Sequence, residues 1–164
     1  MKIIVNDANI LIDLLSVNLL DIFLELDYEF HTNDFILNEI TNQTQRHQLE
    51  KVIEANKLIL NETKSKDYVE ILKLKTKGLS FEDCSIWFYA KKIGGILLTG
   101  DNLLRKTAEK DMIPVKGILF VFDELVDSGK LDKKAARFKL FQLTKLNPRL
   151  PVLEINKRLV HWEK

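Results

Sequence analysis

The chain has 164 residues, of which 46% are hydrophobic and 30% charged, and it contains only six glycines and three prolines. This length suits one domain with a substantial core, and the composition excludes a disordered chain or a flexible linker. The net charge of +1 indicates no particular partner, and no apolar run approaches the ~18–20 residues of a membrane span.

In the first half of the chain, short apolar runs alternate with segments of helical periodicity. A β-branched run predicts a strand at Lys2–Asn6, an alternating pattern predicts one at Tyr28–Thr32, and a short apolar run predicts one at Leu58–Asn61. Helical segments are predicted at Ala8–Ser16, Asn18–Leu26, Gln45–Ala55 and Lys66–Lys75. A further short helix ends near Glu39–Ile40, with Asn33 or Asp34 as its N-cap. The segment Lys66–Lys75 is expected to stop at Gly78, a residue type typical of helix C-caps.

The second half continues the alternation. Ser80-Phe81-Glu82-Asp83 resembles a capping box, and the helix that it opens is expected to run to Lys92 and close at Gly94-Gly95. Strands are predicted at Ile96–Thr99 and, as a short edge strand, at Pro114–Val115. Further helices are predicted at Asn102–Lys110, Ile118–Val126 and Asp132–Leu146, with a break at Gly129, while the tail Val152–Lys164 fits either a helix or a strand.

Strands that alternate with helical segments predict an α/β fold with a mostly parallel sheet. In such a sheet the carboxyl ends of the strands meet at one edge, where ligands bind. Asp7 directly follows the first strand, and Asp101 follows the strand Ile96–Thr99. Both carboxylates are therefore expected at that edge, although each also stands where a helix N-cap is expected.

Two further acids are expected close to the core edge. Asp83 heads the apolar side of its helix, in register with Ile86 and Ala90. Glu39 lies in register with Ile36 in a short, mostly apolar helix. The alternative interpretations are that the helix N-terminus simply stabilises Asp83 and that Glu39 faces solvent.

Four acids that converge on one sheet edge would repel one another. Such a cluster persists only with raised pKa values or a bound cation. Ligands that are all oxygen, without His or Cys, favour Mg²⁺ or Mn²⁺ over zinc. These ions promote attack of water on a phosphodiester, so the pattern indicates phosphoryl-transfer hydrolysis without a nucleophilic side chain.

Three blocks of the sequence resemble the PIN domain family. The opening block is IIVNDANILIDLL, which carries Asp7 and Asn9, and the second is TNDFILNEI, which carries Glu39. The third and most distinctive block is GLSFEDCSIWFYAKKIGGILLTGDNLLRKTAEK, which carries Asp83, Thr99 and Asp101. The resemblance covers about residues 2–118.

This resemblance implies a three-layer α/β/α sandwich with a central parallel sheet of four to five strands. It also implies a ribonuclease that needs Mg²⁺ or Mn²⁺ and leaves 5′-phosphate and 3′-hydroxyl ends. Many bacterial relatives are toxins neutralised by an antitoxin and are often dimeric, so RNA, an antitoxin protein and a second copy of the chain are the implied partners. The four implied catalytic and metal-binding residues are Asp7, Glu39, Asp83 and Asp101, with Asn9 and Thr99 in support.

Residues 1–118 are expected to form the nuclease domain, and residues 119–164 a C-terminal helical extension packed on the same domain. The extension is longer than in the compact toxins of the family. Its cations could form a basic arm, a dimer surface or an antitoxin site. These cations are Lys133, Lys134, Arg137 and Lys139.

The distribution of charge suits a phosphodiester substrate. Residues 1–82 carry 9 Lys and Arg against 14 Asp and Glu, whereas residues 83–164 carry 16 against 10. Arg105 and Lys106 could contact substrate phosphate; two ordinary solvated faces are the alternative. The single cysteine, Cys84, excludes an internal disulfide and suits a cytoplasmic protein.

Two alternative functions are compatible with parts of this pattern. A haloacid-dehalogenase-type phosphatase would need a second Asp where this chain has Asn9. A PIN fold that has lost catalysis and binds RNA or a protein partner is the stronger alternative. Retention of all four acids argues against it, because a scaffold has no need to keep them together.

Overall fold

The computed structural model describes residues 1–164 and contains a five-stranded sheet in which every strand pair is parallel. The strand order is β3-β2-β1-β4-β5, so β1 lies at the centre. The strands are β1 (Ile3–Asn6), β2 (Glu29–Asn33), β3 (Ile59–Asn61), β4 (Ile96–Leu98) and β5 (Val115–Lys116). The predicted α/β class is confirmed.

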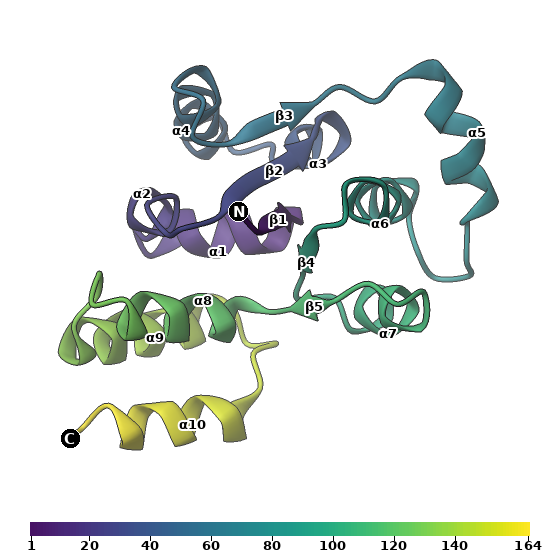
Figure 1. The fold of residues 1–164 in the computed structure, drawn as a ribbon. Helices are drawn as coiled ribbons and strands as arrows, with labels where there is room; N and C mark the ends of the chain where they lie inside the picture. Colours follow the sequence, from purple (N-terminus) through teal and green to yellow (C-terminus); the bar gives the residue numbers. More distant parts are fainter.

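The chain has ten helices, and those that cover the two faces of the sheet give the predicted three-layer sandwich. They are α1 (Ala8–Ser16), α2 (Leu20–Phe23), α3 (Asp34–Glu39), α4 (Gln43–Glu54), α5 (Ser65–Lys73), α6 (Phe81–Ile93), α7 (Asn102–Lys110), α8 (Ile118–Asp127), α9 (Lys133–Leu146) and α10 (Val152–His161). Figure 1 shows α1, α2 and α8 on one side of the sheet and α6 and α7 on the other.

The central strands are apolar on both faces because helices cover both faces. Ile4 and Val5 on β1, like Leu97 and Leu98 on β4, expose no surface. Strands buried in this way read as continuous apolar runs and not as an alternation of apolar and polar residues. For this reason β1 and β4 could be recognised in the sequence as short apolar runs.

Some predicted boundaries were wrong. The helix expected at Asn18–Leu26 is only the four residues of α2, because Asn18 adopts the left-handed conformation with φ of 55°. The helix α5 ends at Lys73 and not at Gly78. Gly78 has φ of 91°, and a Cβ at this position would come within 2.7 Å of Leu103 Cδ2. This glycine therefore permits a close approach to α7 and caps no helix.

The C-terminal helices pack on the first helices of the chain. α8 contacts α2 and α9, and α9 contacts α1. Lys139 Nζ donates a hydrogen bond to the carbonyl oxygen of Val17 at 2.7 Å, and Arg137 forms an ion pair with Glu163 at 3.1 Å. Two of the four cations expected to form a basic arm are thus bound within the chain.

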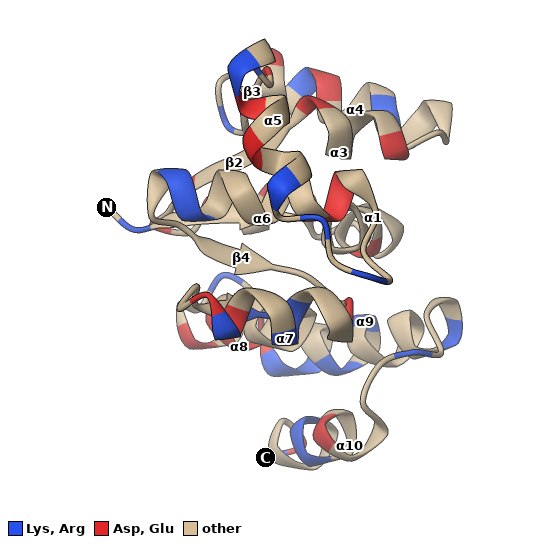
Figure 2. Ribbon diagram, turned by 90° about the vertical axis from the view of Figure 1, so that its right-hand side faces the viewer, with Lys and Arg blue, Asp and Glu red and all other residues tan.

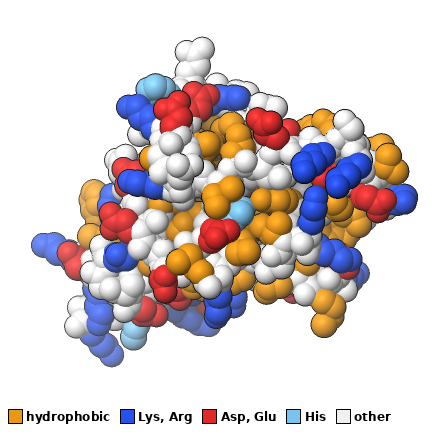
Figure 3. Space-filling view, turned by 45° about the horizontal axis from the view of Figure 1, so that its top comes forward, with side chains coloured by type: hydrophobic (Ala, Val, Ile, Leu, Met, Phe, Trp, Pro, Cys, Tyr) orange, Lys and Arg blue, Asp and Glu red, His pale blue; other side chains and the backbone are white.

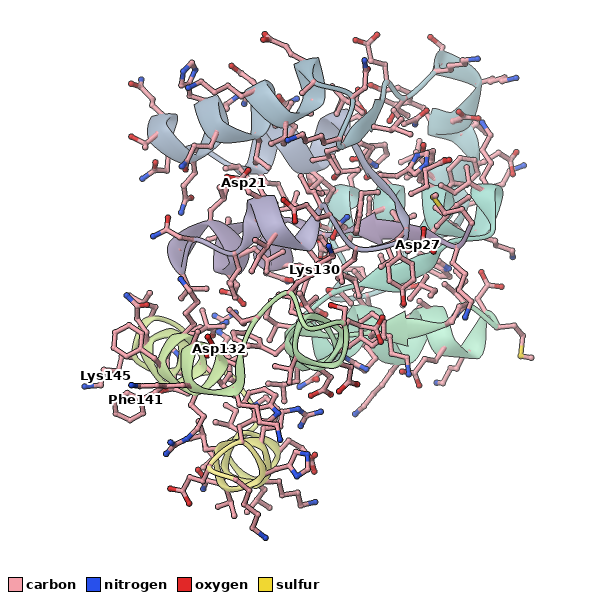
Figure 4. The ribbon with its side chains drawn as sticks, turned by 60° about the vertical axis from the view of Figure 1, so that its left-hand side comes forward. Asp21, Asp27, Lys130, Asp132, Phe141 and Lys145 are labelled. Carbon is pink, nitrogen blue, oxygen red and sulfur yellow. The ribbon has the colours of Figure 1, made fainter.

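The last helix, α10, adds a further layer on α9. The end of the chain, whose sequence fitted either a helix or a strand, is helical over Val152–His161. This helix buries Ile155, and Trp162, which follows it, is also buried. The outer side of α9 stays exposed, and Figure 4 shows Phe141 and Lys145 there, with Lys145 Nζ 4.8 Å from the ring centroid. None of the ten helices combines the length and apolar character that a membrane crossing requires.

Candidate active site

The order of the strands reverses between the neighbouring strands β1 and β4. From β1 the sheet grows outward through β2 and β3, and the chain then returns to the other side of β1 for β4 and β5. Open α/β sheets bind ligands at such a reversal, beyond the carboxyl ends of the strands. Asp7 directly follows β1, and Asp101 lies in the connection that follows β4. The predicted convergence of these two acids on one edge is confirmed.

Asp7 lies at the centre of this edge and is only 3% exposed. Its Oδ1 accepts a hydrogen bond from the backbone N–H of Ala8 at 2.9 Å. Its Oδ2 accepts from Thr99 Oγ1 at 2.6 Å and from Asn9 Nδ2 at 3.3 Å. Desolvation and the nearby carboxylates outweigh these hydrogen bonds and raise the pKa of Asp7 to about 6.

Asn9 and Thr99 tie Asp7 to the connection after β4. Asn9 Oδ1 accepts from the backbone N–H of Gly100 at 2.9 Å. Thr99 Oγ1, which donates to Asp7, also accepts from the backbone N–H of Asp101 at 3.1 Å. The two residues therefore hold Asp7 in one orientation and fix the backbone that presents Asp101.

Asp83 and Asp101 each use one carboxylate oxygen to cap a helix. Asp101 Oδ1 accepts from the backbone N–H of Leu104 at 2.7 Å. Asp83 Oδ2 accepts from the backbone N–H of Ser80 at 3.0 Å, which completes the predicted capping box of α6. The second oxygen of each carboxylate receives no protein hydrogen bond. Asp7 and Asp101 are thus confirmed as helix N-caps. Asp83 and Asp101 nevertheless each keep one carboxylate oxygen that could bind a cation.

Glu39 is the last residue of α3 and stands exposed at the rim. Partial desolvation, and then the negative charges of Asp7, Asp83 and Glu82, raise the pKa of Glu39 to about 7. Glu39 is therefore within electrostatic reach of the cluster. Glu82 is a further acid whose charge acts on Glu39, and the sequence did not single it out as a site residue. Its only signal in the sequence was its position next to Asp83.

All four predicted acids line one pocket of about 420 Å³, together with Asn9. They do not converge tightly, because no three His, Cys, Asp or Glu side chains of the chain form a ready-made group of metal ligands. The pocket thus collects acidic oxygen atoms around one buried carboxylate and leaves room between them. An arrangement of this kind can attract a hard cation and a ligand that carries phosphate.

The predicted contrast between an acidic and a basic half of the chain does not become two opposite faces. Lys and Arg as well as Asp and Glu occur on helices on both sides of the sheet in Figure 2. On the face in Figure 3, side chains of both signs lie interspersed around apolar groups. Net charge therefore does not locate a site for nucleic acid.

The two cations singled out in the sequence lie in different surroundings. Arg105 is half-buried and lines a second, larger cavity next to the acidic pocket, whereas Lys106 is exposed on α7 and lines none of the pockets described here. The same cavity is lined by Asn147 and Arg149, two residues that the sequence interpretation did not single out. No local pattern marked them, because they precede and follow a proline in a connection between two helices.

A family model described as a PIN domain matches residues 3–164, which is nearly the whole chain and includes the helices after residue 118. No curated protein sequence matches the chain.

Proposed function

This chain belongs to the PIN domain family, and on that premise we propose that it is an endoribonuclease that depends on Mg²⁺ or Mn²⁺. PIN domains are generally nucleases and typically use divalent metals. The observation that carries the proposal is the pocket at the reversal of the sheet, where Glu39, Asp83 and Asp101 lie around the buried carboxylate of Asp7.

The donor atoms of the pocket suit a hard cation. All four residues offer carboxylate oxygen, and Asp83 and Asp101 each keep one oxygen free of protein hydrogen bonds. Desolvation, and then neighbouring negative charges, raise the pKa values of Asp7 and Glu39, and a cation would relieve the repulsion between these charges. The residues that would hold it are Asp7, Glu39, Asp83 and Asp101.

When bound, Mg²⁺ or Mn²⁺ supplies the positive charge that promotes attack of water on a phosphodiester and stabilises the charge that develops there. The protein supplies orientation. Thr99 and Asn9 hold the carboxylate of Asp7 by hydrogen bonds at 2.6 and 3.3 Å. The capping box holds Asp83 at the start of α6, and Thr99 also fixes the backbone N–H of Asp101. Such supporting contacts keep ligands in place before the substrate arrives.

The direct test compares RNA cleavage in the presence of Mn²⁺ by the native chain and by Asp7→Asn. The native chain is expected to cleave single-stranded RNA, and the variant to lose cleavage by at least ~100-fold, because a central ligand has lost its charge. Mn²⁺ should also raise the melting temperature of the native chain and not that of the variant.

The matched control is Asp21→Asn, the same chemical change at an exposed residue of α2 (labelled in Figure 4) that does not line the acidic pocket. This variant should cleave like the native chain. Equal cleavage by the native chain and Asp7→Asn, or none by the native chain with any divalent ion, would overturn the proposal.

For the biological role we propose the toxin of a toxin–antitoxin pair, acting as a dimer in the cytoplasm. The family membership supports this role, since many bacterial PIN domains have it. Expression of the native chain should then arrest bacterial growth, and Asp7→Asn should not. Continued growth while RNA cleavage is retained in vitro would favour a housekeeping nuclease.

The alternative is a catalytically silent PIN fold that binds RNA or a protein partner. It is favoured by the loose arrangement of the acids, of which no three form a ready group of ligands. It predicts that Mn²⁺ leaves the melting temperature unchanged, so the thermal measurement separates the two functions.

A further inference from the structure

A cavity of about 950 Å³ adjoins the acidic pocket, and Asn9 and Asp101 line both. Its walls come largely from three connections that are distant in the sequence: the one after β4, the one between β5 and α8, and residues Leu146–Pro151 between α9 and α10 (Figure 1). The volume falls in the ~300–1,000 Å³ typical of small-molecule sites. The candidate active site thus continues toward the C-terminal helices.

The Leu146–Pro151 wall is held in place by its own hydrogen bonds. Asn147 Nδ2 donates to both carboxylate oxygens of Asp13 on α1, at 3.3 and 3.1 Å. Asn147 Oδ1 accepts from the backbone N–H of Arg149 at 3.1 Å. Pro148 and Pro151 restrict the backbone on either side of Arg149. These contacts therefore fix the position of this wall of the cavity.

Two arginines line this cavity without a close carboxylate partner. Arg149 has no ion-pair partner in the chain. Arg105 has only Glu109, at 3.9 Å, and its guanidinium rests against Gly117, where a Cβ would come within 2.9 Å of Nη2. By contrast, Arg158 on α10 is held by Asp123 at 2.7 Å. Arg105 and Arg149 are thus available to an anion.

The rest of the lining combines apolar surface with amide groups and with the carboxylates of Asp13 and Asp101. Ile118, Leu119, Leu146 and Leu150 supply apolar contacts. A ligand that suits both kinds of lining carries phosphate for the guanidinium groups and a flat ring for the apolar wall. A nucleotide has both.

We propose that this cavity binds a nucleotide of single-stranded RNA next to the bond that is cleaved, with Arg105 and Arg149 on its phosphate groups and the apolar wall against its base. The proposal rests on the proposed function, because the shared Asn9 and Asp101 connect the cavity to the acidic pocket. The connection between α9 and α10 then takes part in the choice of RNA sequence.

The test measures binding of a short fluorescent single-stranded RNA to the full native chain in EDTA, where no metal supports cleavage. Arg149→Ala should weaken binding about tenfold, because a charge-assisted contact to phosphate is lost. It should also reduce the slope of log affinity against log salt by about 0.7, the value for one phosphate contact on a single strand.

Arg149→Lys serves as a second variant. It keeps the charge, so the salt slope should stay as in the native chain while affinity falls through loss of the guanidinium fork. The matched control is Lys157→Ala, which removes one cation from α10 outside the cavity, where Lys157 pairs only with Glu154. Its affinity and slope should equal those of the native chain.

Unchanged affinity and slope in Arg149→Ala, or equal losses in Arg149→Ala and Lys157→Ala, would overturn the cavity assignment. Competition by poly-glutamate as strong as by unlabelled RNA would also overturn it, because the cavity would then recognise negative charge and not a nucleotide. Failure of the nuclease proposal is seen separately, as absence of cleavage with Mn²⁺ while binding in EDTA still depends on Arg149.

Discussion

The hydroxyl of Thr99 serves two parts of the site at once. It donates to Asp7 Oδ2 at 2.6 Å and accepts from the backbone N–H of Asp101 at 3.1 Å, and it is fully buried. A methyl group of the same size can do neither. The orientation of Asp7 and the presentation of Asp101 therefore depend on a single oxygen atom.

Replacing Thr99 by Val should lower the affinity for Mn²⁺ by roughly 10–100-fold, as loss of a supporting contact to a ligand does. The free energy of unfolding should fall by about 1–2 kcal/mol, because a partly buried N–H and a buried carboxylate lose a partner. Mn²⁺ titration by calorimetry and urea denaturation measure these quantities. The control is Thr107→Val, whose hydroxyl bonds only its own helix; equal effects at both positions would contradict the role given to Thr99.

At the scale of single elements, local sequence signals set both ends of α6. Ser80 and Asp83 exchange the two hydrogen bonds of a capping box, and Gly94 ends the helix in the left-handed conformation with φ of 70°. No atom lies within 4 Å of a Cβ built on Gly94. The requirement for glycine there is thus a matter of backbone conformation alone.

Gly94→Ala should lower the free energy of unfolding by about 1 kcal/mol, the cost of placing an ordinary residue in the left-handed region. Gly94→Asn should lose less, since asparagine tolerates that region better. Thermal or urea unfolding of the two variants measures the difference. Equal stability of the alanine variant and the native chain would show that α6 ends in another way in solution.

Across the whole molecule, Asp13 links the first helix to the C-terminal connection. Its carboxylate accepts both hydrogen bonds from Asn147. Desolvation outweighs these hydrogen bonds and raises the pKa of Asp13 from 3.8 to about 6. A carboxyl whose pKa is higher in the folded state stabilises that state below pH ~4, and the stabilisation is lost as pH rises through about 6.

Asp13→Asn cannot ionise, and its amide oxygen can still accept from Asn147. The melting temperature of the native chain relative to this variant should therefore fall between about pH 4 and pH 7 and stay level above it. Calorimetric scans of both proteins across this range test the sign. A difference that is constant with pH, or one that grows in favour of the native chain as pH rises, would contradict the raised pKa.

Much of the fold could be predicted because its signals are local. Short apolar runs and a stretch of alternating residues located the strands, and the helices α1 and α7 have the predicted bounds. The capping box at Ser80 and Asp83, and Asn33 as one of two candidate caps, were also marked by residue type and spacing. Gly78 shows the limit of such signals, because a glycine is needed there to make room for Leu103 on another helix. A glycine looks the same in the sequence whether it ends a helix or makes room for a neighbour.

The sequence by itself determined the class of the fold, the strand ends that carry Asp7 and Asp101, and the kind of atom that the pocket offers. Periodicity and capping act over a few residues, so a linear pattern contains them. Only the tertiary structure decided which distant groups meet: Thr99 with Asp7 across 92 positions, and Asn147 with Asp13 across 134. The second cavity depends on such contacts, because three separate connections form its walls, and for that reason Arg149 gave no signal in the sequence.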